Sequence, residues 1–340
     1  MFTKASVIEI KTLLDARPKC AIVMHRGPDG DAIGSSLGWH HILRKQGIDS
    51  TVIAPDAYPD FLKWMPGNEG VMVFEKNREK VAEVINEADL IFCLDFNSPD
   101  RMGNLKDTVI EAHKPMVVVD HHRQPADFAQ SYYVDDTASS AAEMIYRLNK
   151  ALGWKKHLDH NAAICLYTGI VTDTGSFRFS SVSPKLMRIA SRLMETGMDH
   201  TEVYRNVFDS QSVSRLKLQG FAISEKLEVM EDAAAAFISL TQEELQRFNY
   251  QKGDTEGLVN QALSIRGINM AAFFSEKDGL IKISFRSRGS FDVNTFARNH
   301  FEGGGHSMAA GGKSELAMNE TLDKFRKLVS ENAESIKASV

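Results

Sequence analysis

The first half of the chain alternates short apolar runs, rich in β-branched residues, with longer stretches of helical periodicity. This alternation is typical of strands joined by crossover helices, and it predicts an α/β fold with a Rossmann-like parallel sheet. The expected strands are residues 20–25, 90–95 and 116–120, with a weaker one at 51–54. The expected helices are residues 33–46, 139–151, 160–171 and 184–195.

A polar, helix-prone stretch separates this half from a second pattern. Beyond it, β-type runs at 233–240, 271–276 and 280–287 alternate with helical segments at 241–248, at 293–299 and from about 319 onward. The glycine-rich residues 301–312 are expected to form a loop. We therefore predict three parts: an N-terminal domain, a helical connector and a smaller α/β C-terminal domain, at residues 1–195, 196–218 and 219–340.

Composition narrows the classes of protein to consider. The 340 residues are 43% hydrophobic and 25% charged, which is ordinary for a globular protein. A net charge of −5 argues against a protein that holds long nucleic acid by neutralising phosphates. No run approaches the roughly 18 apolar residues of a membrane span, so we expect a cytoplasmic protein without a membrane partner. Cys20, Cys93 and Cys165 are widely spaced in apolar runs and are expected to be buried thiols.

Acidic and histidine residues follow several of the expected strands and one expected helix. Because the carboxyl ends of parallel strands share one edge of a sheet, these side chains are expected to gather there. Taken alone, the first loop could simply be a turn whose aspartate caps the next helix. The gathered residues are His25, Asp29, Asp31, Asp95, Asp120, His121, His122 and Asp173.

Four carboxylates at one sheet edge would raise one another's pKa and destabilise the fold unless cations balanced them. The four are Asp29, Asp31, Asp95 and Asp173. Two divalent cations would balance four charges. Carboxylate oxygens combined with imidazole nitrogens favour Mn²⁺, although Mg²⁺, Co²⁺ and Zn²⁺ remain possible. A pair of such ions can activate water for attack on phosphorus.

The order and spacing of these residues resemble the four motifs of the DHH phosphoesterase family. The resemblance implies a manganese-dependent enzyme with one metal held by His25, Asp29 and Asp95. It implies that the second metal is held by Asp31, Asp95, His121 and Asp173, with Asp95 bridging. It further implies that Asp120 orients a histidine and that His122 faces the phosphate, so that Asp95, Asp120 and His122 form the catalytic group.

The segment GGGHSMAAGG at residues 303–312, preceded by FRSRG, resembles the DHH-associated C-terminal domain. Backbone N–H groups of such glycines can approach an anion closely, although a flexible surface loop with solvated arginines would have the same composition. The family pattern implies a terminal-nucleotide site. Its residues would be Arg286, Asn294, Gly304, Gly305 and His306, with Arg101 of the first domain as a further phosphate contact.

Within the family, the two-domain layout is similar to the bacterial nanoRNase / pAp phosphatase branch. We therefore expect hydrolysis of very short oligoribonucleotides to mononucleotides, and of 3′-phosphoadenosine 5′-phosphate (pAp) to AMP. The alternatives are a linear or cyclic dinucleotide phosphodiesterase, an inorganic pyrophosphatase and a non-catalytic RNA-binding module. The expected partners are short oligoribonucleotides and small nucleotides, and the family allows a homodimer.

Overall fold

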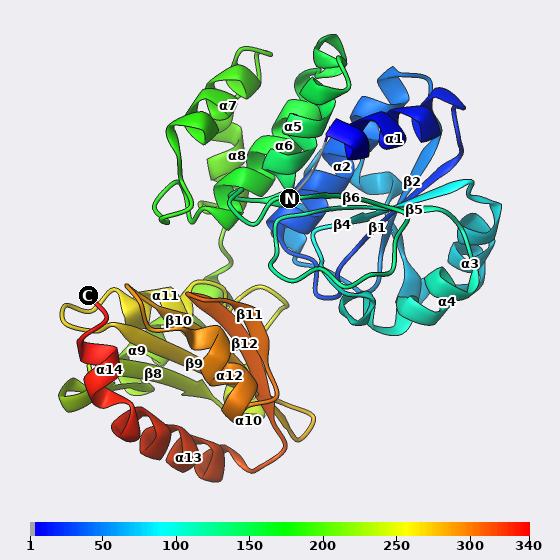
Figure 1. Ribbon diagram of the computed structural model, residues 1–340. Helices are drawn as coiled ribbons and strands as arrows, with labels where there is room; N and C mark the ends of the chain where they lie inside the picture. Colours follow the sequence, from blue (N-terminus) through cyan, green and yellow to red (C-terminus); the bar gives the residue numbers. More distant parts are fainter. Residues whose placement is uncertain (1–3) are drawn as a thin grey trace. The chain divides into compact units, whose positions relative to one another are not determined.

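The computed structural model describes residues 4–340, which form two compact units (Figure 1). The division between the units falls between Ser210 and Gln211, inside the stretch predicted as a connector, 196–218. No helix in the described residues is both long and apolar enough to cross a membrane. Each unit has its own buried hydrophobic core, so each is described by itself.

The first unit is built on a 6-stranded sheet in the order β3-β2-β1-β4-β5-β6, and every neighbouring pair is parallel. The predicted α/β class with a Rossmann-like parallel sheet is therefore confirmed. The sheet gains two strands that sequence analysis missed, β3 and β6, because they have only 2 and 4 residues. The strands are β1 (Cys20–Met24), β2 (Ser50–Ala54), β3 (Met72–Val73), β4 (Leu90–Leu94), β5 (Met116–Asp120) and β6 (Ser131–Val134).

Helices cover both faces of this sheet (Figure 1). Alternate strand residues supply the two cores: Ile22 and Phe92 pack on the face of α1, α2, α5 and α6, while Val23 and Cys93 pack on the face of α3 and α4. The helices are α1 (Lys4–Asp15), α2 (Gly30–Lys45), α3 (Arg78–Glu87), α4 (Lys106–Glu111), α5 (Ala141–Ala151), α6 (His160–Asp173), α7 (Pro184–Met194) and α8 (His200–Val207).

Glycines allow α2, α5 and α6 to pack unusually closely. A Cβ on Gly34 of α2 would lie 2.5 Å from the carbonyl oxygen of Cys165 in α6. A Cβ on Gly169 of α6 would lie 2.7 Å from Cβ of Ala142 in α5 and 2.8 Å from a carboxylate oxygen of Asp31. The backbones therefore approach to distances that any side chain would prevent.

The second unit is built on a mixed 6-stranded sheet in the order β11-β12-β10-β9-β8-β7. Its neighbouring pairs are antiparallel except β8 and β9, which are parallel. The predicted smaller α/β domain is thus present. The strands are β7 (Leu227–Met230), β8 (Ala235–Leu240), β9 (Met270–Lys277), β10 (Leu280–Ser287), β11 (Gly304–His306) and β12 (Ala309–Ser314).

Helices lie on both faces of this second sheet as well. One face packs a cluster of phenylalanines, among them Phe237, Phe274 and Phe285, against α12 and α13, and the other packs Ile238 and Phe273 against α9, α10 and α11. The helices are α9 (Val213–Glu225), α10 (Gln242–Arg247), α11 (Leu258–Leu263), α12 (Val293–His300), α13 (Met318–Glu331) and α14 (Ala333–Lys337).

The expectation of a loop over 301–312 was wrong. These residues contain the antiparallel pair β11 and β12. A Cβ on Gly303 would lie 2.0 Å from the carbonyl oxygen of Gly311, and one on Gly305 would lie 2.5 Å from that of Ala309. The glycines allow two backbones to approach closely within a sheet, rather than making the chain flexible.

Cys20, Cys93 and Cys165 are buried free thiols, as predicted. Burial raises the pKa of Cys20 and Cys93 to about 12 and raises that of Cys165 as well. These thiols therefore stay protonated and serve as small apolar side chains in the core.

We predict that Gly34→Ala destabilises the first unit by about 1–3 kcal/mol, because its new methyl group meets backbone rather than a movable side chain. The matched control is Gly220→Ala in α9, where a Cβ meets nothing within 4 Å. That change should stabilise the protein by about 0.5–1 kcal/mol, since alanine has less backbone freedom to lose. Chemical denaturation measures both, and equal effects of the two changes would contradict the packing argument.

Candidate metal site

The candidate site lies at the point where the strand order of the first sheet reverses. His25 directly follows β1 and Asp95 directly follows β4, and β1 and β4 are neighbours in the sheet. In open α/β sheets the crevice at such a switch point is where ligands bind. The two loops are joined because the N–H of Arg26 donates to the carbonyl oxygen of Arg101 over 2.6 Å.

Asp95 is the centre of the arrangement. Its Oδ2 lies 3.4 Å from Nε2 of His25, and its Oδ1 lies 3.4 Å from Nε2 of His121. The residue is 2% exposed and has a φ of 65°. A non-glycine residue in this left-handed region is uncommon. The backbone thus turns sharply after β4 and aims one carboxylate at two imidazoles.

A first group of ligand atoms surrounds one oxygen of Asp95. His25 donates from Nδ1 to the carbonyl oxygen of Arg26 over 2.8 Å, which leaves Nε2 facing the site, 3.8 Å from Oδ2 of Asp29. Asp29 also caps α2, since its Oδ1 accepts from the N–H groups of Asp31 and Ala32 at 3.0 Å each. The capping role that the sequence left open is therefore real, and it still leaves one oxygen for the site.

A second group surrounds the other oxygen of Asp95. Nε2 of His121 lies 3.5 Å from Oδ2 of Asp173, at the end of α6, and 3.8 Å from Oδ2 of Asp31. Both oxygens of Asp31 accept from the first turn of α5, over 2.6 Å from Ala141 N–H and 2.9 Å from Ala142 N–H. A helix N-terminus favours negative charge, so α5 holds this carboxylate in place.

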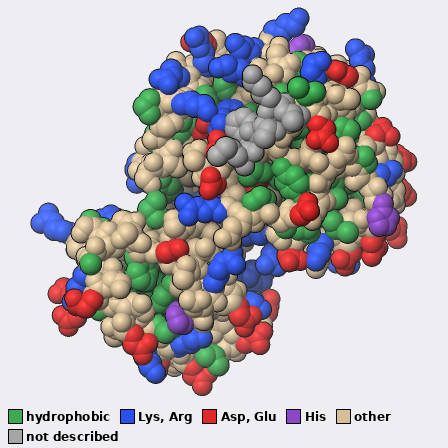
Figure 2. Space-filling model, in the orientation of Figure 1, with side chains coloured by type: hydrophobic (Ala, Val, Ile, Leu, Met, Phe, Trp, Pro, Cys, Tyr) green, Lys and Arg blue, Asp and Glu red, His purple; other side chains and the backbone are tan. Residues whose placement is uncertain are grey.

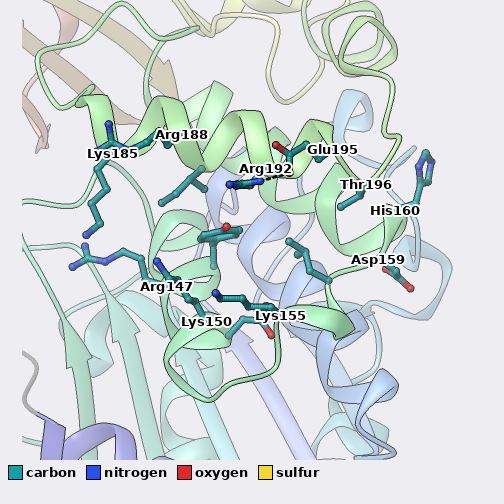
Figure 3. A pocket seen from close by; sticks show the side chains of 14 residues that line it. Arg147, Lys150, Lys155, Asp159, His160, Lys185, Arg188, Arg192, Glu195 and Thr196 are labelled. Carbon is teal, nitrogen blue, oxygen red and sulfur yellow. Dashed lines mark hydrogen bonds and ion pairs between the residues drawn. The ribbon is translucent and has the colours of Figure 1, made fainter.

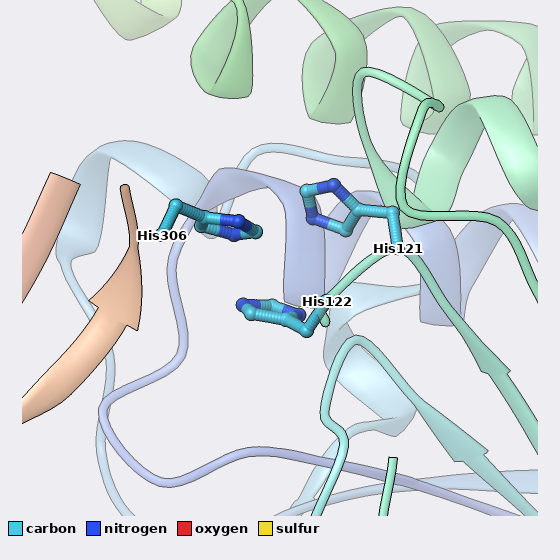
Figure 4. Close-up of side chains that lie close together, drawn as sticks. All are labelled: His121, His122 and His306. Carbon is cyan, nitrogen blue, oxygen red and sulfur yellow. The ribbon is translucent and has the colours of Figure 1, made fainter. Parts of the chain in front are cut away.

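The third feature is the pair Asp120 and His122. Nδ1 of His122 donates to Oδ1 of Asp120 over 2.7 Å, and Asp120 is fully buried at the end of β5. The rings of His121 and His122 lie beside one another with centroids 4.8 Å apart (Figure 4). Because Asp120 accepts the hydrogen bond from Nδ1–H, the ring of His122 is held with Nε2 directed away from that carboxylate.

The protonation of these groups reflects crowding. Burial alone would raise the pKa of Asp95, but His121 and His25 outweigh it and hold that pKa below its usual range. Burial would lower the pKa of His25, but Asp29 and Asp95 raise it to about 10. Burial, with Asp95 adding to it, raises the pKa of Asp173 to about 6. Without cations, the histidines must therefore carry the balancing positive charge.

The donor set fits divalent metal ions. In the described first unit, ligand atoms within 4.8 Å of one another come from His25, Asp29 and Asp95, and likewise from Asp31, His121 and Asp173. In the same part of the chain, Oδ1 of Asp95 has no hydrogen-bond partner although it is buried. A buried carboxylate oxygen without a donor is costly, and a cation would satisfy it.

The residues expected to contact substrate in the second unit form a small cluster of their own. Oδ1 of Asn294 accepts from the N–H of Gly305 over 2.9 Å and from Nε of Arg298 over 3.1 Å. Sequence analysis missed Arg298. The spacing of four residues from Asn294 on an expected helix is the signal that could have found it.

Arg286 and His306 belong to the same surface of the second sheet. Arg286 pairs with Ala309, and Ala309 pairs with His306, across β10, β12 and β11. Opposed residues on neighbouring strands point to the same face of a sheet. Figure 4 shows the imidazole of His306 projecting from β11, and Gly304 begins this strand.

Arg101 is exposed, and its backbone carbonyl accepts from the N–H of Arg26, the residue next to His25. Two serines at the start of α5 have structural partners. Ser140 caps α5 by accepting from the N–H of Glu143, and Ser139 donates to the carboxylate of Glu143 over 3.0 Å. Both hydroxyls are buried.

Known proteins resemble this chain over most of its length. The Bacillus subtilis bifunctional oligoribonuclease and PAP phosphatase NrnA is 30% identical over 85% of this chain and 88% of its own. The Listeria monocytogenes cyclic-di-AMP phosphodiesterase PdeA is 28% identical over 87% of this chain and 45% of its own. The structure of an exopolyphosphatase-related protein from Bacteroides fragilis covers 98% of each chain at 39% identity, with a TM-score of 0.93.

Two family descriptions match the two units separately. Residues 19–170 match the DHH family, N-terminal domain, and residues 232–335 match the DHHA1 domain. The first range contains each residue of the candidate metal site except Asp173. The order of acidic and histidine residues, the switch-point geometry and these matches agree: the chain belongs to the DHH family, with a DHHA1 domain in its second unit.

Proposed function

We propose that this protein is a metal-dependent phosphoesterase that hydrolyses very short oligoribonucleotides to mononucleotides and pAp to AMP. One observation carries the proposal: Asp95 presents one oxygen to each of two groups of metal-binding side chains. A carboxylate shared in this way is what a two-metal phosphoesterase requires. The NrnA relative supports the substrate class.

The proposed metal ligands fall into the two groups of side chains that surround the two oxygens of Asp95. His25, Asp29 and Asp95 would hold one ion, and Asp31, Asp95, His121 and Asp173 would hold the other. Bound divalent ions supply positive charge to the phosphate and lower the pKa of water. We propose Mn²⁺ for both positions, because the set mixes carboxylate oxygens with imidazole nitrogens and contains no thiolate.

His122 is proposed to act on the phosphate itself. Hydrolysis adds water to phosphorus and breaks the P–O bond to the leaving nucleotide, whose oxygen then needs a proton. The hydrogen bond to Asp120 fixes the ring and directs Nε2 away from that carboxylate. His122 can thus hold a proton at Nε2 for an oxygen of the phosphate or of the leaving group.

The second unit is proposed to bind the terminal nucleotide. Asn294 fixes the N–H of Gly305 and the guanidinium of Arg298 in one cluster, and such a cluster offers donors to an anion. Arg286 and His306 share a face of the sheet. Arg101 in the first unit is proposed as an additional phosphate contact.

A linear or cyclic dinucleotide is the second candidate substrate class, and the similarity to PdeA favours including it. The same metal-binding groups would serve either reaction. A linear dinucleotide has free ends, as a short oligoribonucleotide does, whereas a cyclic dinucleotide has none. Direct comparison of substrates with and without free ends therefore separates the cyclic candidate from the others.

We predict that the purified protein with Mn²⁺ converts a 5′-labelled trinucleotide to mononucleotides and releases phosphate from pAp. A product time course fixes both the bond cleaved and the direction of attack. Chelation by EDTA should abolish both reactions, and Mn²⁺ should restore them better than Mg²⁺. A cyclic dinucleotide run in parallel tests the second candidate. Inertness toward all three would refute the proposed function, and strict dependence on Zn²⁺ would refute the choice of manganese.

We predict that metal binding releases protons, because the metal must displace the proton that His25 holds below its raised pKa of about 10. The apparent metal affinity should therefore rise between roughly pH 7 and pH 9, by about tenfold per pH unit for each proton displaced. Calorimetry in buffers with different ionisation enthalpies counts the released protons. An affinity that does not change with pH would contradict the assignment of histidines as ligands.

We predict distinct losses for three variants. Asp95→Asn should remove both metal binding and activity, because it alters the shared carboxylate. His122→Ala should keep metal binding but lower kcat by about 10²–10⁴-fold, and Asp120→Asn should lower it by about 10–100-fold.

The matched control for these variants is His113→Asn. His113 lies three residues before the amino end of β5, the opposite end from His121, and its φ of 50° is tolerated by asparagine. It should retain full activity. If His122→Ala lost its metals as well, His122 would be a ligand rather than a group acting on the phosphate.

A further inference from the structure

A basic groove of the first unit is lined by residues of α5, of α7 and of the segment that leads into α6, outside the candidate metal site (Figure 3). It has a volume of about 920 Å³, within the range of small-molecule sites, roughly 300–1,000 Å³. Figure 2 shows Lys and Arg side chains gathered over α5 and α7. The cationic lining residues are Arg147, Lys150, Lys155, Lys185, Arg188 and Arg192, against two carboxylates, Asp159 and Glu195.

Much of this positive charge has no carboxylate to balance it. Arg147 pairs with Asp135 and Glu143, and Arg192 pairs with Glu195. Among the ion pairs of residues 4–340, none involves the other four cations of the groove, which are Lys150, Lys155, Lys185 and Arg188. The excess is notable in a chain with a net charge of −5.

The cations also face one another. Figure 3 shows the side chains of Lys185 and Arg147 pointing toward each other from α7 and α5. Burial first, and then the charge of Arg147, lowers the pKa of Lys185. Glu143 and Asp135 act on Lys185 in the opposite direction, but burial and the charge of Arg147 outweigh them. A bound anion would relieve the remaining repulsion between the two cations.

The floor of the groove is apolar. Tyr146 and Leu158 are half-buried and Ile189 is buried, and all three line the cavity. A flat aromatic ring next to several cations suits a ligand that joins phosphates to a ring system. Asp159 and Glu195 lie away from Arg147 and Lys185 in Figure 3. These carboxylates would limit how far an anionic ligand extends.

The groove is separate from the metal site although α5 connects them. The first turn of α5 holds Asp31 through Ala141 and Ala142. Arg147 comes six residues after Ala141, which is about 9 Å along a helix. None of the residues lining the groove belongs to the two groups of metal-binding side chains.

We propose that this groove is a second ligand site, which binds a small molecule carrying a linear chain of at least three phosphate groups. Four unbalanced cations match the charge of such a chain. The bounded cavity and the acidic chain as a whole favour a compact ligand over a long nucleic acid. The source of the phosphate chain is either an inorganic polyphosphate or a nucleoside polyphosphate, and binding measurements distinguish them.

The test is calorimetry of the full-length protein in EDTA. Without metal, the carboxylates of the metal site repel phosphates, so binding in EDTA is independent of the proposed hydrolysis. Binding at the groove is told apart from binding at the proposed nucleotide site of the second unit by the groove variant described below. The probes are inorganic tripolyphosphate, ATP, AMP and a ten-nucleotide RNA. We expect tripolyphosphate and ATP to bind at one site and AMP to bind at least about tenfold more weakly. Tighter binding of ATP identifies a nucleoside polyphosphate, and equal binding identifies the phosphate chain alone.

The variant for this test is the double change Lys185→Ala and Arg188→Ala, which should weaken ATP and tripolyphosphate binding by about tenfold or more. The matched control is Lys156→Ala, an exposed lysine next to Lys155 that does not line the groove. Its affinity should be unchanged. Hydrolysis of pAp by the double variant should also be unchanged, since neither residue belongs to the proposed catalytic machinery.

Three results would overturn the proposal. The first is the absence of tripolyphosphate and ATP binding in EDTA. The second is binding that the double variant does not weaken. The third is tighter binding of the RNA than of tripolyphosphate with the same loss in the double variant, because the groove would then be a nucleic-acid surface.

Discussion

The first unit depends on one electrostatic constraint, the gathering of carboxylates where its strand order reverses, of which Asp31, Asp95 and Asp120 are buried. Removing a single charge from water costs several kcal/mol, and here Asp95 shares its surroundings with Asp29, Asp31 and Asp173. Backbone N–H groups compensate part of this cost at Asp29 and Asp31. The imidazoles compensate another part at Asp95. The remaining negative charge must be balanced by cations, and without bound metal ions only protonated histidines can balance it.

Helix packing determines whether these carboxylates can meet at all. Gly34 and Gly169 bring α2, α5 and α6 so close that Asp31 reaches the N–H groups of Ala141 and Ala142. The same contact places Asp173, at the end of α6, beside His121. A larger residue at either glycine would separate the helices and the ligand atoms together. Core packing and site geometry are therefore one property of the first unit, not two.

The sequence predicted the parts of the fold that have strong local signals. Strands β1, β4 and β5 are continuous apolar runs ending in polar residues, so their position and the meeting of His25, Asp95 and His121 could be inferred. Strand β3 has only 2 residues and depends on pairing with β2. The pair β11 and β12 looked like a loop because glycine weakens every local preference, while its pairing is decided by backbones distant in sequence. Which oxygen of each carboxylate faces which imidazole also depends on tertiary contacts.

Helix α5 links two sites of opposite sign within one unit. Its first turn holds an acidic site, and its later turns carry Arg147 and Lys150 into a basic groove. The metal site attracts a phosphate only when cations are bound, because its five carboxylates outnumber the imidazoles around them and its own net charge is negative. The positive charge of the groove comes from its lysine and arginine side chains and does not depend on bound metal. A phosphate-bearing molecule therefore meets one surface whose attraction is conditional on metal and another whose attraction is permanent. Of these two surfaces of the first unit, only the groove attracts such a molecule when metal is scarce.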